Sequence, residues 1–222
     1  MSTKDWNDKQ KKLKVLLSDQ KTFSKGKDLL LEMHGLLHDN KVYKTGVETV
    51  YDNVWENLRD ETCRIISSKE TSIVWNIWHI TRIEDLIANI IMGNKETVFN
   101  NEVQAKLNIK IKDSGNAMTY SDIERFNQAI NIKALKEYRV KVGKSTKKII
   151  ESLEYGDMKK KVTAEQLEKI KKNGGVVNDP KSIWLLDFWG RKNTVGLIMM
   201  PITRHQQVHL NDCLKIKQKY NR

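Results

Sequence analysis

The 222 residues include 40 Lys and Arg against 28 Asp and Glu, a net charge of +12, but only two Pro and 11 Gly. Antiparallel β folds need many turns rich in Pro and Gly, so this composition argues against them and favours long helices. The positive charge favours encounters with anions without choosing among nucleic acid, membrane surfaces and small substrates. Most lysines lie in mixed-sign runs, which are typical of solvated helix faces.

The location that the sequence predicts is the cytoplasm. Cys63 and Cys213 cannot form a disulfide framework, and the first residues contain no apolar stretch of the kind that directs secretion. The most apolar stretch, 72–92, is an improbable membrane span because it carries four polar or charged groups: His79, Arg82, Glu84 and Asp85.

In the first half of the chain, residues 6–38 are predicted to be helical, with an interruption near 23–26, and 45–58 form a short amphipathic segment. The stretch 72–92 is apolar nearly all round, which predicts a central, buried helix that ends at Gly93. Residues 95–118 are polar and without periodicity, which predicts irregular structure.

In the second half, long helices are predicted over 133–153 and 194–219, the latter with a kink at Pro201. Shorter helices should begin at three cap signals: Thr119 or Ser121, Thr163, and Asp179–Pro180. The sequence therefore predicts an all-α fold, with one domain over 1–222. Its core would be a four-helix bundle, with short helices and a long insertion before the last main helix. The four main helices would be 10–38, 72–92, 133–153 and 194–219.

The chain has five histidines, four of them in HxxxH pairs, in which two imidazoles share one helix face. In the last helix, His205 and His209 belong to a face with the 4, 3, 4, 3, 4 spacing of Ile198, Ile202, His205, His209, Asp212 and Ile216. His79 lies on a similar apolar stripe of 72–92. These two stripes predict that His79, His205 and His209 bind one divalent metal ion inside the bundle. The alternative is that His79 is a core histidine and the pair a polar patch.

His34 and His38 form the competing pair. His34 lies on an apolar face and could line the pocket, whereas His38 adjoins Asp39 and Asn40 at a helix end, where we expect solvent and a capping role.

Neighbours of the three histidines suggest supporting roles. Arg82 could hold a carboxylate or phosphate beside the ion, or form an interior salt bridge. Asp212 could orient an imidazole or be an ordinary surface residue. Trp75 would pack as core or pocket wall. Glu84 lies on an apolar face and needs a partner, for which the sequence offers two candidates: Arg191 and Arg204, the latter also a pocket candidate.

Three segments resemble the DinB-like superfamily: Leu31–His38, Ser72–Asp85 and Met200–Asn211. The resemblance implies a four-helix bundle, often a homodimer, with a divalent ion on one histidine of the second main helix and on an HxxxH of the last. By position these are again His79, His205 and His209. The stretch from Gly93 to Pro180 is longer than a minimal member needs, so the substrate does not carry over.

Some relatives are S-transferases or isomerases that use low-molecular-weight thiols, so a small anionic or thiol-linked molecule is one candidate substrate, although the sequence leaves the substrate of this chain open. Three imidazoles leave a coordination position open, as in catalytic sites, and Zn or Ni is the ion expected first. The sequence leaves open whether the protein is an enzyme, a transferase or hydrolase, or a non-catalytic metal-stabilised stress-response bundle. Nucleic-acid binding is the weaker alternative, because the lysines are interspersed with acids and no known nucleic-acid motif occurs.

Overall fold

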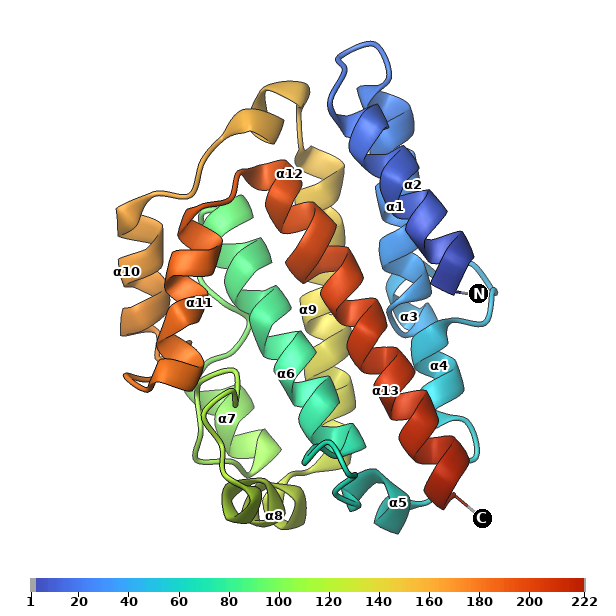
Figure 1. Ribbon diagram of the computed structural model, residues 1–222, viewed down its shortest axis with the longest axis vertical. Helices are drawn as coiled ribbons and strands as arrows, with labels where there is room; N and C mark the ends of the chain where they lie inside the picture. The colour runs from blue at the N-terminus through green and yellow to red at the C-terminus, as the bar shows by residue number, and fades with distance from the viewer. Residues whose placement is uncertain (1–2, 222) are drawn as a thin grey trace.

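Helices make up the regular structure over residues 3–221, the part of the chain that the computed structural model describes (Figure 1). Within this part no β-strand forms, and the only bridge joins Lys161 and Asn193. The prediction of an all-α fold is confirmed. The helices, in chain order, are α1 Thr3–Leu17, α2 Phe23–Leu36, α3 Asn40–Tyr43, α4 Val50–Trp55, α5 Asp60–Arg64, α6 Ile73–Asp85, the π-helix η1 Leu86–Met92, α7 Asn101–Leu107, α8 Tyr120–Ala129, α9 Ile132–Ser152, the 3-10 helix η2 Tyr155–Lys159, α10 Ala164–Lys172, α11 Pro180–Gly190, α12 Thr194–Leu197, the π-helix η3 Ile198–Arg204 and α13 His205–Tyr220.

The stretch predicted as one interrupted helix is an antiparallel pair, α1 and α2, and the turn between them falls earlier than predicted, at 18–22. The two helices meet closely at Gly26, where an added Cβ would lie 3.0 Å from the backbone of Leu16. Residues 95–118, predicted to be irregular, contain the short helix α7, which Asn100 caps by accepting a hydrogen bond from Val103 N.

The central helix begins at Ser72, whose hydroxyl accepts the Trp75 N–H, and every residue of α6 is buried. It runs beside α13 on one side and α9 on the other, and α2 packs against α1 and α9 (Figure 1). α10 packs against η1 and α11, at the edge of the group formed by α6, α9 and α13 (Figure 1). None of the helices in residues 3–221 has the length and apolarity that a membrane crossing requires.

The last helical stretch, where the sequence predicts a kink at Pro201, contains the π-helix η3 around this proline. Proline has no N–H to donate to the preceding turn. Side chains around it also donate to backbone carbonyls: Thr203 Oγ1 donates to Ile198 O at 2.7 Å and Gln206 Nε2 to Pro201 O at 3.1 Å. The wider π turn shifts the faces of the helix that follows. The fully buried side of α13 therefore carries Gln206, Leu210 and Cys213, and the two histidines lie at its edge.

Candidate metal centre

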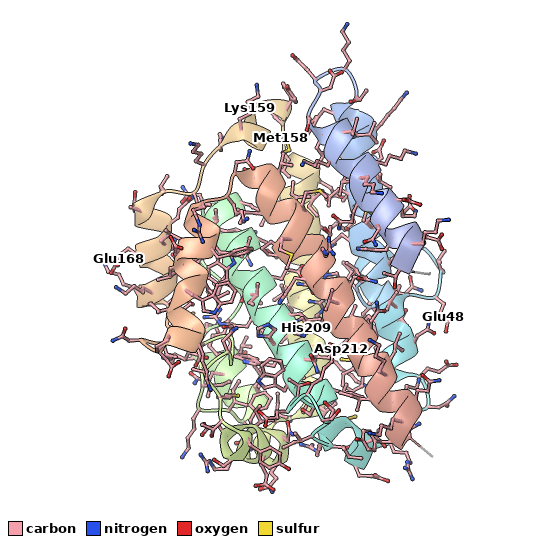
Figure 2. The ribbon with its side chains drawn as sticks, in the orientation of Figure 1. Glu48, Met158, Lys159, Glu168, His209 and Asp212 are labelled. Carbon is pink, nitrogen blue, oxygen red and sulfur yellow. The ribbon has the colours of Figure 1, made fainter. Side chains whose placement is uncertain are left out.

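The structure brings together His79 of α6 with His205 and His209 of α13, and one nitrogen of each lies within 4.8 Å of the others. The imidazole centroids are 4.5 to 5.0 Å apart. Figure 2 shows His209 on α13, beside α6. The i, i+4 spacing and the side-by-side course of the two helices, both visible in the sequence pattern, bring these rings together.

Hydrogen bonds fix which nitrogen of two of these rings faces the others. His79 Nδ1 donates to the carbonyl of Ser114 at 2.7 Å, and His209 Nδ1 donates to Asn76 Oδ1 at 2.6 Å. The amide of Asn76 is itself oriented, because its Nδ2 donates to Ser72 O at 2.7 Å. Both rings therefore carry their proton on Nδ1 and present the lone pair of Nε2, which is how an outer acceptor prepares a histidine for a metal.

The inner nitrogens need a cation or a proton between them. His79 Nε2 and His205 Nε2 lie 3.1 Å apart, and His205 Nδ1 is buried without a hydrogen-bond partner. Burial, together with the neighbouring His209, lowers the pKa of His79 to about 3, and burial and the charge of Lys69 lower that of His209 to about 4. Burial also holds the pKa of His205 well below its usual range. All three rings are neutral at neutral pH, the form that binds metals, so the donor set fits a divalent ion.

One wall of the site is aromatic and the opposite side is polar. The indole of Trp75 stacks on His79 at 4.7 Å between centroids and 9° between planes. His205 and His209 are partly exposed, and Asp212 follows His209 along α13 (Figure 2). The carboxylate of Asp212 accepts two hydrogen bonds of 2.9 Å from the ammonium of Lys69. Asp212 thus pairs with lysines, including Lys215 at 3.5 Å, and has no hydrogen bond to an imidazole among the described residues.

We expect Asn76→Ala to weaken divalent-metal binding about 10- to 100-fold, because His209 would lose the acceptor that fixes its tautomer. Asn76→Asp is the matched control: it keeps an acceptor oxygen and should retain most of the affinity. Competition with a chromophoric chelator measures both constants. Equal affinities for Asn76→Ala and the wild type would show that this hydrogen bond does not prepare the site.

Arg82, predicted either to grip an anion or to form an interior salt bridge, does the second. It is fully buried, lies 3.6 Å from Asp85, and donates to Lys112 O and Asn173 Oδ1, both at 2.6 Å. The segment 110–118 covers α6 and satisfies its buried polar side chains, because three backbone carbonyls of this segment accept hydrogen bonds from them. The donor and acceptor pairs are Arg82 with Lys112, Trp78 with Asp113 and His79 with Ser114.

Two other residues predicted to line the metal pocket lie elsewhere. Arg204 is exposed and lines a separate groove near α1, because its position next to His205 turns it to another face of the helix. His34 belongs to a second cluster, with His38 and Glu84, whose candidate ligand atoms also lie within 4.8 Å of one another.

All side chains of the second cluster are fully buried. His34 Nε2 donates to Glu84 Oε1 at 2.9 Å, and Arg139 Nη1 donates to Glu84 Oε2 at 2.9 Å. The partner of Glu84 is therefore Arg139 of α9, and the expectation of Arg191 or Arg204 is wrong. The expectation that His38 is solvated at a helix end is also wrong, because the ring packs against Gly143 of α9, where an added Cβ would lie 2.5 Å from Nδ1.

The second cluster is a poorer metal site than the three histidines, although its donor types would suit an ion. Both carboxylate oxygens of Glu84 already accept hydrogen bonds, and His34 Nε2 carries a proton, because the ionised carboxylate 2.9 Å away can only accept. The other ring nitrogen, Nδ1, lies 2.8 Å from Tyr43 Oη. Burial opposes ionisation of Glu84, yet His38, Arg139 and the hydrogen bond from His34 hold its pKa well below the usual range. A divalent ion here would add charge beside a buried guanidinium, at a high desolvation cost.

The fold and the site define a class of protein: a helical protein in which two neighbouring helices bring three histidines together. The sequence model of the DinB superfamily matches residues 45–212. The match covers more than half of the chain, so the chain belongs to the DinB superfamily. His79, His205 and His209 lie inside the matched range, and His34 and His38 lie outside it. No curated protein matches the chain.

Proposed function

We propose that this protein binds one divalent metal ion, Zn or Ni, through His79, His205 and His209. We further propose that the ion serves a transferase or hydrolase reaction on a small anionic or thiol-bearing substrate. The observation that carries the proposal is that Ser114 O and Asn76 Oδ1 turn two Nε2 lone pairs toward the third histidine. In the same proposal the chain is one domain, and α2, α6 with η1, α9, and α12 to α13 form the four-helix bundle.

A divalent ion in this position would supply Lewis acidity, lowering the pKa of a bound water or thiol. The protein's own residues would do the rest. Asn76 and Ser114 hold the imidazoles in place, and Trp75 covers His79. At the partly exposed side, Lys69 and Lys215 share the single carboxylate of Asp212, which leaves a net positive charge that would attract an anionic substrate.

Metal content of the untagged protein, measured by mass spectrometry, tests the binding. We expect about one equivalent in the wild type and none in the folded His205→Ala/His209→Ala variant, because a single remaining imidazole holds an ion weakly. Two equivalents in the wild type would mean that the cluster of His34, His38 and Glu84 also binds metal. No metal after incubation with Zn or Ni would refute the proposed site.

Catalysis is tested separately, with a low-molecular-weight thiol and an electrophilic acceptor. Turnover should depend on added metal and vanish in His209→Ala while circular dichroism stays that of a folded helical protein. A metal-free wild type that melts at a lower temperature, with no turnover in the loaded protein, would instead show that the ion serves stability alone.

A further inference from the structure

A concave surface separate from the candidate metal centre lies between α1 and the segment Lys192–Arg204. Its volume is about 1080 Å³. The hydroxyl of Tyr155, in η2, donates to Ser18 O at 3.2 Å and joins the two walls at one end. Met158 and Lys159, also of η2, lie at this end (Figure 2). We call this surface the α1 groove.

The rim of the α1 groove is positively charged. Five cationic side chains line it, and no acidic side chain is among its lining residues in the described chain: the cations are Lys11, Lys14, Lys159, Lys192 and Arg204. Within residues 3–221, Lys14, Lys159 and Arg204 have no carboxylate within 4.0 Å, and Lys11 has only the exposed Asp8 at 3.8 Å. Elsewhere many surface lysines are paired with acids, as Lys106 is with Glu102 and Lys147 with Glu151.

The uncharged lining of the α1 groove, which we call its floor, is mainly apolar, with Gln10 and Asn193 among its polar members. It is built from side chains of α1, η2, α11 and the last helical stretch, among them Leu17, Met158, Phe188, Val195, Met199 and Met200. Methionines adapt their shape to different apolar ligands. The wall that α1 provides, from Asn7 to Leu17, is roughly 15 Å long at about 1.5 Å per residue. An apolar trough of this length inside a cationic rim is suited to a ligand with an extended apolar part and an anionic group.

We propose that the α1 groove binds a monomeric amphiphile with a single acyl or alkyl chain and a phosphate head group. Several unpaired cations favour a multiply charged phosphate over a carboxylate. The concave floor lets a single chain enter, whereas a flat bilayer would touch only the rim. A second copy of this chain is disfavoured as the occupant, because each copy carries a net charge of +12.

Calorimetric titration with dodecyl phosphate below its micelle concentration, at physiological salt, tests the proposal. We expect one molecule bound per chain, about tenfold or more tighter than dodecyl maltoside, which has the same chain without charge, and inorganic phosphate, which has the charge without a chain. Equal binding of either control would overturn the proposal. So would binding only to vesicles of phosphatidylcholine and phosphatidic acid, or only to an acidic amphipathic peptide.

Two charge reversals locate the site. Lys14→Glu/Arg204→Glu should weaken binding of dodecyl phosphate about tenfold or more, while Lys144→Glu/Lys172→Glu, an equal charge change at exposed lysines outside the groove, should alter it less than about twofold. Met199→Gln, which keeps the size of a floor residue, should also weaken it. If the groove variant does not fold, the single change Lys159→Glu takes its place. Equal losses in the groove and control variants would show non-specific attraction and refute the site.

Discussion

Replacing Arg139 with methionine should lower the free energy of unfolding by about 3–5 kcal/mol, because it leaves the fully buried carboxylate of Glu84 without its cation. The change also removes the donor to Leu37 O, 3.1 Å away, at the end of α2. Urea unfolding monitored by circular dichroism measures the effect. Lys147→Met on the same helix is the matched control: Lys147 pairs with Glu151 on the surface, and its loss should cost at most about 0.5 kcal/mol.

The double variant Glu84→Gln/Arg139→Met separates the ion pair from the packing of each side chain. With both charges removed, its loss of stability should be smaller than the sum of the two single losses by about 1–3 kcal/mol. Additive losses would mean that Glu84 and Arg139 do not depend on each other. A variant as stable as the wild type would show that the buried pair is replaceable by neutral groups, as is known for some buried ion pairs.

Arg139 shows how a residue central to the core can be missed in a sequence. Leu135, Arg139, Val142, Thr146 and Ile149 are spaced 4, 3, 4 and 3, so the arginine lies on the apolar face of α9, and all five are buried. The periodicity was sufficient to find it, but a charged residue in a lysine-rich helix is usually solvated. Its burial depends on Glu84 and Leu37, which are distant in sequence, and helix periodicity does not show such pairing.

Some residues of the candidate metal centre could be predicted from the sequence, and others could not. Apolar periodicity with the HxxxH spacing singled out the three histidines, because the donors come from regular helices. The carbonyl of Ser114 could not be predicted, since any residue has a carbonyl and the path of the segment 110–118 is set by tertiary contacts. The role of Asn76 left a weak signal, three residues before His79 on the same helix. Asp212 shares the regular helix α13 with both histidines, but its partners are Lys69 and Lys215, and Lys69 comes from a loop distant in sequence that helix periodicity does not show.

The buried neutral histidines should make the metal-free protein sensitive to mild acid. Burial lowers the pKa of His38 and His79 to about 3 and of His209 to about 4, against about 6.5 in the unfolded chain. At a pH between the folded and the unfolded pKa values, the unfolded chain binds more protons than the folded one. The free energy of unfolding is therefore greatest above pH 6.5 and decreases as the pH falls toward 4. The low pKa of Glu84 acts with the same sign below its usual value of 4.5.

Each of these histidines contributes a slope of about 1.4 kcal/mol per pH unit once the pH is well below 6.5 and still above its folded pKa. Several together would remove a typical stability of about 5–15 kcal/mol within a few pH units. We therefore expect the metal-free protein to unfold at about pH 4 to 5. The midpoint of urea unfolding, measured at half-unit pH steps, tests this expectation. His38→Gln, if folded, should flatten this dependence by about one proton, since glutamine does not titrate. If the free energy of unfolding stayed unchanged between pH 7 and 4.5, these imidazoles would bind protons without unfolding the chain. Water would then have to reach them in the folded protein.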